Sequence, residues 1–266
     1  MRRYIITKEL KEAIKKDKHT IRELTNLLGF DLKCILNKNI SISENHWIKL
    51  KSFLNLNLDL KKVYFDYGNN LGEGYITISI KKVKITPDLA ELIGIMLGDG
   101  NIHKNTSKIA FDKRNKKYLK YVEKLFYKIF GIRLKKTIYE KTNQAYLHCN
   151  NLYVVEELLK LGLKRGHKIK NQLGIPNWIK ENKNYSKKCI RGLIDTDGCI
   201  YICKREKQRY VKFTNYNKKL LEDFKEVTKN LGYSFAKANK RNACLYRKVE
   251  VVKFIKDIQP LKATGL

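Results

Sequence analysis

The feature that most constrains the fold of this chain is a motif that occurs twice. Residues 92–100, LIGIMLGDG, align without a gap with residues 190–198, IRGLIDTDG. Both stretches are largely apolar, are typical of a helix and end on an acid followed by glycine. An acid is unfavourable at the C-terminal end of a helix, where unpaired carbonyl groups already carry partial negative charge. One Asp-Gly pair would be read as an ordinary turn, but its repetition in the same context calls for another explanation.

The similarity continues downstream of both motifs. Residues 101–131 and 199–232 each have the pattern of a hairpin followed by an amphipathic helix and a glycine. Two short alternating segments and an apolar-rich closing helix then follow in both places. The period of about 100 residues is too long for a solenoid, so we predict an internal duplication of an αββαββα unit. The predicted fold class is α+β, with pseudo-symmetric halves at 85–180 and 181–266.

Small residues recur at matching places in the two motifs. Residues four apart share one helix face, and here they are Gly94 and Gly98 in the first motif and Gly192 and Thr196 in the second. Small side chains at this spacing allow two helix backbones to approach closely. If the motif helices pack there, Asp99 and Asp197 meet at their C-terminal ends and repel each other. A divalent cation relieves that repulsion, and Mg²⁺ suits carboxylate, water and phosphate oxygens.

The two motifs resemble the paired signature motifs of the LAGLIDADG homing endonucleases, in the form that carries both halves in one chain. The stretch IPNWI at 175–179 is also similar to that family, and the resemblance spans residues 75–266. It implies a homing endonuclease-like fold and a site-specific endonuclease that hydrolyses double-stranded DNA with Mg²⁺ or another divalent cation. It further implies intron homing by a monomer, on a long target that is pseudo-palindromic or asymmetric.

The resemblance also implies roles for single residues. The last acid of each motif binds metal and is catalytic in the family, which carries over to Asp99 and Asp197. The carbonyl group before each acid contributes to the metal site, which implies Gly98 and Thr196. In better-known relatives a lysine between the last strand of a half and its closing helix assists catalysis, and Lys248 holds that place here. The first half has no lysine at the matching position.

Three more positions near the motifs are informative. Asp195 stands where the first motif has Leu97, so we expect Asp195 to be structural, capping or pairing with a nearby base. Lys113 and Asn215 stand near the second-strand position where the family often has a glutamine-type residue. Both are therefore candidates for contact with DNA.

The polar faces of the predicted strands form the expected DNA-binding surface. Period-two alternation turns these residues inward: Ile102, Ile109 and Phe111 in the first half, and Ile200, Ile202, Val211 and Phe213 in the second. A curved sheet can follow the major groove with its opposite face and contact base edges and phosphates there. The candidates on that face are Asn101, His103, Lys108, Arg133, Lys135 and Tyr139 in the first half, and Tyr201, Arg205, Tyr210, Lys212 and Thr214 in the second.

Charge supports a nucleic-acid partner. The 266 residues hold 57 Lys and Arg against 26 Asp and Glu, a formal net charge of +31 that is spread along the whole chain. Such an excess fits a polyanion. The six cysteines lack paired metal-ligand spacing, and no apolar run approaches the ~20 residues of a membrane span. We therefore expect an intracellular, cytoplasmic protein associated with the nucleoid and no membrane partner.

Residues 1–60 are predicted to form a separate helical module. Thr20 and Glu23 have the spacing of a capping box at the start of an amphipathic helix, Gly29 ends that helix, and a short helix follows. The arrangement resembles a repressor-type helix-turn-helix, with Asp31–Lys38 as the recognition helix. The candidates for DNA contact in that helix are Lys33, Asn37 and Lys38. Residues 61–84, which alternate and contain several glycines, are expected to be a linker with one or two strands.

Two other functions remain open at this point. A helix-turn-helix module fused to a LAGLIDADG fold can belong to a DNA-binding transcriptional regulator that does not cleave. The same fold can also serve an RNA-binding intron maturase. The presence of both acids favours the nuclease over the regulator, and the helix-turn-helix pattern favours DNA over RNA.

Overall fold

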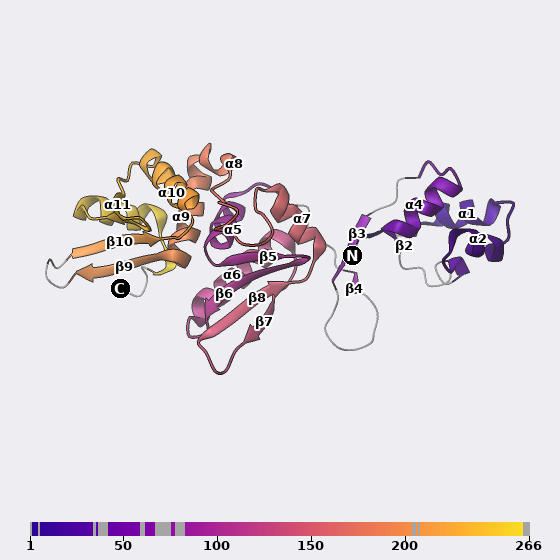
Figure 1. Ribbon diagram of the computed structural model, residues 1–266, viewed down its shortest axis with the longest axis horizontal. Coiled ribbons are helices and arrows are strands. Elements are labelled where there is room, and N and C mark those ends of the chain that lie inside the picture. The colour runs from indigo at the N-terminus through magenta and orange to yellow at the C-terminus, as the bar shows by residue number, and fades with distance from the viewer. Residues whose placement is uncertain are drawn as a thin grey trace. The chain divides into compact units, whose positions relative to one another are not determined.

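The computed structural model describes residues 2–4, 6–33, 36, 42–58, 62–66, 76–77, 83–203, 206 and 208–262. The chain forms two compact units, Met1–Ser79 and Ile80–Leu266, which Figure 1 shows as ribbons. Among the described residues, no helix is long and apolar enough to cross a membrane.

The N-terminal unit combines helices with a small antiparallel sheet. Its elements are β1 (Arg2–Tyr4), α1 (Lys8–Lys16), α2 (Ile21–Leu28), β2 (Ile42–Ser43), α4 (Glu44–Phe53), β3 (Lys62–Asp66) and β4 (Ile76–Thr77). The strands pair in the order β2-β1-β3-β4. The expectation of an all-helical module was therefore wrong, because strands of two or three residues are too short for alternation to show in the sequence. The expected linker strands belong to this sheet, since β3 pairs with β1.

The expected helix signals of this unit are present. Thr20 and Glu23 form a capping box at the start of α2, and Gly29 ends α2 in the left-handed conformation, with φ 71°. Leu24 and Leu28 of α2 are buried, whereas Leu27 is exposed. Of the predicted recognition helix, the structure describes 31–33 and 36, so the helix-turn-helix remains a prediction.

The second unit contains the same series of elements twice. The first half contains α5 (Pro87–Gly98), β5 (Gly100–His103), β6 (Thr106–Asp112), α6 (Lys116–Phe130), β7 (Lys135–Ile138), β8 (Gln144–Cys149) and α7 (Leu152–Lys160). The second half contains α9 (Lys183–Asp197), β9 (Gly198–Cys203), β10 (Gln208–Thr214), α10 (Lys218–Asn230), β11 (Ala236–Asn239), β12 (Asn242–Leu245) and α11 (Lys248–Ile258). The short helix α8 (Asn177–Lys180) precedes α9. The two antiparallel sheets have equivalent strand orders, β5-β6-β8-β7 and β9-β10-β12-β11, which confirms the duplicated α+β fold.

The two motif helices form the centre of this unit. Helices α5 and α9 lie between the two sheets (Figure 1), and their small residues let the backbones touch. A Cβ atom on Gly94 would overlap the carbonyl group of Cys189, and one on Gly98 would overlap the side chain of Thr196. A Cβ atom on Gly192 would lie 2.8 Å from the backbone nitrogen of Ile95. The predicted close contact of the motif helices is therefore confirmed.

A buried polar cluster also joins the two halves. Glu91 of α5 is fully buried. Its Oε1 atom accepts a hydrogen bond from the Tyr121 hydroxyl and lies 3.4 Å from Arg191 Nε, and its Oε2 atom lies 3.2 Å from Lys188 Nζ. Because Lys188 and Arg191 belong to α9, this cluster fixes the register of one motif helix against the other.

Candidate active site

Both motif acids lie at the C-terminal ends of the packed helices. Asp99 is the C-cap residue of α5, and Asp197 is the last residue of α9. Burial, together with the negative charge of Asp197, raises the pKa of Asp99 to about 6. Burial also raises the pKa of Asp197. The two acids therefore interact electrostatically, and burial disfavours the charged form of each.

Lys168 reaches this acid pair from the segment between α7 and α8. Its Nζ atom donates to the carbonyl oxygen of Leu97 at 2.9 Å and to that of Gly98. Its positive charge offsets part of the rise in the pKa of Asp99 and of Asp197, while burial lowers the pKa of the ammonium group itself. A lysine therefore stabilises the negative C-terminal pole of α5.

Lys262 occupies the corresponding place at the end of α9. Its Nζ atom donates to the carbonyl oxygens of Thr196 at 2.7 Å and Gly198 at 2.8 Å. Its backbone N–H donates to Asp195 Oδ1 at 3.1 Å. Asp195 is buried and lies 3.9 Å from Arg191 Nε. It therefore holds the chain next to Lys262, in agreement with the structural role expected for it.

Sequence reasoning missed both lysines and favoured Lys248 instead. Lys248 is exposed at the first position of α11, and the contacts described at the acid pair involve Lys168 and Lys262. In a chain with 57 basic residues no single lysine stands out. The duplication held a usable signal, because both lysines follow the closing helix of their own half.

The two halves differ in how they support their acids. Asn215 Nδ2 donates to Asp197 Oδ2 at 2.7 Å. Lys113, at the matching place, instead donates to the carbonyl oxygens of Tyr139 and Glu140, at 3.4 and 3.0 Å. A cavity of about 390 Å³ opens beside Asp197, and it is lined by Leu97, Gly98, Lys168, Ile169, Asp197, Thr214, Asn215, Tyr216 and Asn217. The site is therefore asymmetric.

The first sheet presents most of its predicted polar residues on one exposed face. In the strand register, Asn101 pairs with Lys108, Lys108 with His148, and His148 with Lys135. Asn101, His103, Lys108, Arg133 and Tyr139 are exposed, and Lys135 and His148 are partly buried. A hollow of about 470 Å³ in this face is lined by Thr106, Lys108, Thr137, Tyr139, Tyr146, His148 and Asn150. The polar lining and the basic charge suit contact with DNA.

The second sheet departs from simple alternation. Ile202, expected inward, is 50% exposed, and Tyr210, expected on the polar face, is 7% exposed. Tyr210 packs between the rings of Tyr201 and Tyr246, at centroid distances of 5.6 and 5.5 Å. An aromatic cluster on the polar face explains its burial, since large rings shield one another there. Tyr201 remains exposed.

The remaining candidates for DNA contact are distributed as follows. Lys212, Thr214 and Asn215 are partly buried, and Lys33 in the N-terminal unit is exposed. Asn37, Lys38 and Arg205 lie outside the described residues.

The second half of the second unit is similar to a known domain family. Residues 184–248 match the family model of the LAGLIDADG-like domain. The chain is 25% identical over 160 residues to the ribonucleoside-diphosphate reductase NrdEB subunit alpha of Bacillus subtilis, a match to 55% of this chain and 14% of that protein. It is 27% identical over 287 aligned positions to the replication factor C small subunit of Methanocaldococcus jannaschii, covering 90% of this chain and 15% of that protein. The matches thus span only a small part of these curated relatives.

Solved structures with a similar arrangement have low sequence identity to this chain. The homing endonuclease I-DmoI in complex with DNA and Mn is 16% identical, with a TM-score of 0.46, over 65% of this chain and 96% of that one. The N-terminal LAGLIDADG domain of DUF199/WhiA is 9% identical, with a TM-score of 0.46, over 68% of this chain and 86% of that one.

Proposed function

From the LAGLIDADG-like domain that this chain contains, we propose that the protein is a site-specific endonuclease that hydrolyses both strands of a long DNA target. The observation that carries the proposal is the acid pair, Asp99 and Asp197, at the paired C-terminal ends of α5 and α9, with an ammonium group beside each end. A purely structural contact would not bring two mutually repelling carboxylates into a partly buried site, because nothing in the fold gains from their repulsion. A regulator that only binds DNA has no need of the pair either.

The donor set fits a hard divalent cation such as Mg²⁺. Two carboxylates and the carbonyl oxygens of Gly98 and Thr196 supply the oxygen ligands that such ions prefer. The pKa of both acids is raised because their charged forms are unfavourable at this place. A nearby cation would stabilise the charged forms. A bound divalent cation would supply a polarised water molecule and charge stabilisation for phosphodiester hydrolysis.

The protein's own residues would position the reacting groups. Asn215 fixes one carboxylate oxygen of Asp197, and that carboxylate would orient the attacking water. Lys168 and Lys262 would stabilise the negative charge that develops on the phosphate oxygens. We propose these two lysines, in preference to Lys248, as the basic residues of the site, because their ammonium groups already interact with both acids.

The substrate proposed for this site is double-stranded DNA. The polar face of each sheet would follow the major groove, and the excess of positive charge would bind phosphates. Since one chain contains both halves, a monomer would cut both strands inside the cell. The reductase and the replication protein have different activities, and each is matched over a small part of its length. A similar segment in two such different proteins supports a gene segment that moves between hosts, and thus homing.

One observation favours a second function, that of a DNA-binding regulator without cleavage. Lys168 and Lys262 already donate to the carbonyl oxygens of Gly98 and Thr196. If these ammonium groups stay in place on DNA, they exclude a metal ion from the same oxygens.

A selection from a randomised or genomic duplex library distinguishes the two functions. The purified protein is incubated with the library in Mg²⁺, in Ca²⁺ and in EDTA. The endonuclease proposal predicts double-strand cuts at one long site in Mg²⁺ and binding without cuts in Ca²⁺. Bound but uncut DNA under every condition supports the regulator.

A further inference from the structure

Asn217 occupies a junction between the second half and the segment that carries Lys168. Its side chain is 2% exposed, and its Oδ1 atom caps α10 by accepting from the N–H of Leu220 at 3.3 Å. Its Nδ2 atom donates to the carbonyl oxygens of Leu173 at 2.6 Å and Lys168 at 3.5 Å. The side-chain amide of Asn217 thus caps a helix of the second half and binds a segment of the first half.

The backbone of Asn217 is fixed relative to the catalytic acid. Its N–H donates to Asn215 Oδ1 at 2.8 Å, which leaves Asn215 Nδ2 to donate to Asp197. A short series of hydrogen bonds therefore runs from Asp197 through Asn215 and Asn217 to the backbone of Lys168.

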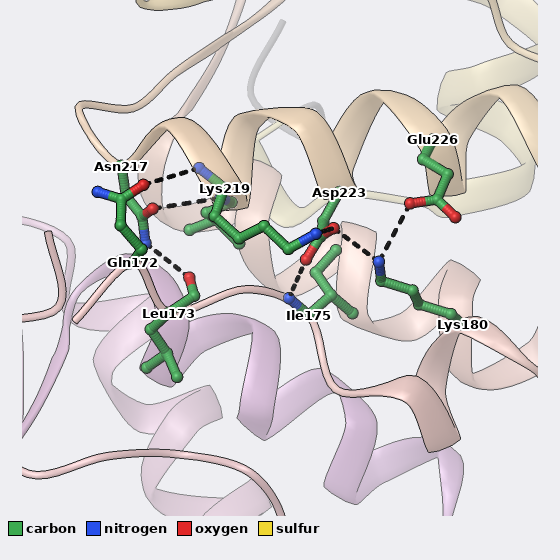
Figure 2. A network of polar contacts seen from close by, with 9 residues as sticks. Gln172, Leu173, Ile175, Lys180, Asn217, Lys219, Asp223 and Glu226 are labelled. Carbon is green, nitrogen blue, oxygen red and sulfur yellow. Dashed lines mark hydrogen bonds and ion pairs between the residues drawn. The ribbon is translucent and has the colours of Figure 1, made fainter.

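Neighbouring contacts hold the same segment on α10. Figure 2 shows Asn217 and Asp223 facing Leu173 and Ile175, and the side chain of Gln172 reaching the backbone of Lys219 in α10. Asp223 Oδ2 accepts from the N–H of Ile175 at 2.8 Å, and the N–H of Lys219 donates to Gln172 Oε1 at 3.3 Å. Asp223 Oδ1 lies 2.6 Å from Lys180 Nζ. These contacts fix residues 172–180, but among the described residues Asn217 is the α10 side chain that bonds to Lys168 itself.

The position of the backbone matters because of the length of the lysine side chain. A lysine carries a point charge on a flexible four-carbon stem, so its ammonium group stays at one place only if its backbone is held. The carbonyl oxygen of Lys168 accepts from the N–H of Leu173 at 3.2 Å as well as from Asn217. Because the Asn217 amide also binds the carbonyl oxygen of Leu173, it ties this whole turn to the second half, while the Lys168 ammonium group binds the end of α5 in the first half.

Within the part of the chain that the structure describes, the first half has no equivalent of this junction. Asn115 is the matching N-cap residue, of α6, and its Oδ1 atom accepts from the N–H of Tyr118 at 3.2 Å. Asn115 is exposed, and among the described residues its side chain makes the capping hydrogen bond and no second one. The two caps are thus alike at the helix end and differ in what else they hold.

We propose that Asn217 is a positioning residue that holds Lys168 against the acid pair. An effect of Asn217 on cleavage depends on the proposed function. An effect of Asn217 on the position of Lys168 does not. Replacing Asn217 by Asp keeps an acceptor that caps α10 equally well and removes the donor to Leu173 and Lys168. Asn115→Asp is the matched control, because it makes the same change at a cap without the second contact.

The first readout needs neither metal nor DNA. Lysine ε-amines of the full chain are labelled with a limiting acylating reagent, and the labelling of Lys168 is compared with that of Lys262 by mass spectrometry. Asn217→Asp should raise the labelling of Lys168 several-fold relative to Lys262, because the released ammonium group becomes accessible. Asn115→Asp should leave the ratio at the wild-type value. Asn217→Ser, which also caps but cannot reach Leu173, should repeat the effect of Asn217→Asp.

The second readout is cleavage of the selected site. A misplaced group costs roughly 10²-fold in rate, so Asn217→Asp should lower kcat by about 10- to 100-fold with little change in KM. An unchanged labelling ratio in both Asn217 variants overturns the inference, even if they cut slowly. If the wild-type protein does not cut any duplex, the proposed function fails, and the labelling ratio still decides the role of Asn217.

Discussion

Asp99 and Asp197 destabilise the protein in the absence of a counter-ion. Each carboxyl group is partly buried at a helix pole of the same sign, and the pKa of each is raised. Lys168 and Lys262 compensate part of this charge by donating to the adjacent carbonyl oxygens. A function that requires the charge of both acids would explain why the protein keeps them at this place. Two measurable effects are expected.

The first effect is on cleavage. Asp197→Asn keeps the size of the side chain and removes its charge, so Mg²⁺-dependent cleavage should fall by about 10³-fold or more, as expected when a metal ligand and charge-stabilising group is lost. Affinity for the target should stay within a few-fold of wild type, because phosphate and base contacts remain. Single-turnover cleavage and a gel-shift titration measure the two quantities. Wild-type cleavage by the variant would remove Asp197 from the metal site.

The second effect is on the pH dependence of stability. The pKa of Asp99 is raised to about 6 in the folded state, so the folded protein binds this proton more tightly than the unfolded chain does. The free energy of unfolding of the metal-free protein should therefore fall as pH rises from about 4 to 6. In Asp99→Asn this fall should become smaller, and at pH 7 the variant should be more stable by on the order of 1–2 kcal/mol.

A control for this prediction has the opposite shift. Arg114 lowers the pKa of the exposed Asp112 to about 2, so Asp112→Asn should change the slope only slightly near pH 4 and leave it unchanged between about pH 5 and 6. Thermal unfolding of both variants and wild type across this range, in EDTA, provides the comparison. A wild-type stability that rises with pH in parallel with Asp99→Asn would contradict the assignment.

At the scale of elements, the contact between α5 and α9 determines where the acids lie. Their backbones touch at Gly94, Gly98 and Gly192, and the Glu91 cluster fixes their register. Because the acids lie at the C-terminal ends of these helices, the helix contact brings two residues that are distant in the sequence into one site.

Gly94→Ala tests this contact. Ala at an open helix position stabilises by about 0.4–1 kcal/mol relative to Gly. At Gly94 the new Cβ atom would overlap the carbonyl group of Cys189, so we expect a loss of roughly 1–3 kcal/mol from overpacking. Urea unfolding measures it, with Val252→Ala on the exposed face of α11 as a control that should change little. A stabilised Gly94→Ala protein would show that the helices are not in close contact.

The elements were largely predictable because their signals are local and repeated. The duplicated motif led to two αββαββα halves, and the small residues at four-residue spacing led to the helix contact. The positions of Lys168 and Lys262 were not predictable, since each reaches its place through segments fixed by long-range contacts such as that of Asn217 with Leu173. Tyr210 was misplaced because an aromatic cluster, not strand alternation, determines its burial. The strands β1 and β2 were too short to leave a pattern.

At the scale of the whole molecule, positive charge dominates. With a net charge of +31, affinity for any DNA should fall steeply with salt, because each neutralised phosphate releases counterions. In our proposal the charge would retain the protein on DNA, and the polar faces of the sheets would select the target.

The N-terminal unit, Met1–Ser79, is proposed to extend the DNA contact. Deleting residues 1–79 should shorten the protected region on the selected target and reduce the salt dependence of binding, because Lys33 and the other basic residues of this unit are lost. Hydroxyl-radical footprinting of the full chain and the deletion measures the protected length. An identical footprint would assign the unit another role.

The central claim, cleavage of both DNA strands by the acid pair, is tested most directly on the selected duplex labelled at the 5′ end of each strand. The full chain is incubated with it in Mg²⁺ and in EDTA, and the products of each strand are separated. Our account predicts one discrete cut in each strand in Mg²⁺ and none in EDTA. A duplex that is bound and remains intact in Mg²⁺ would contradict the account and identify the protein as a DNA-binding regulator.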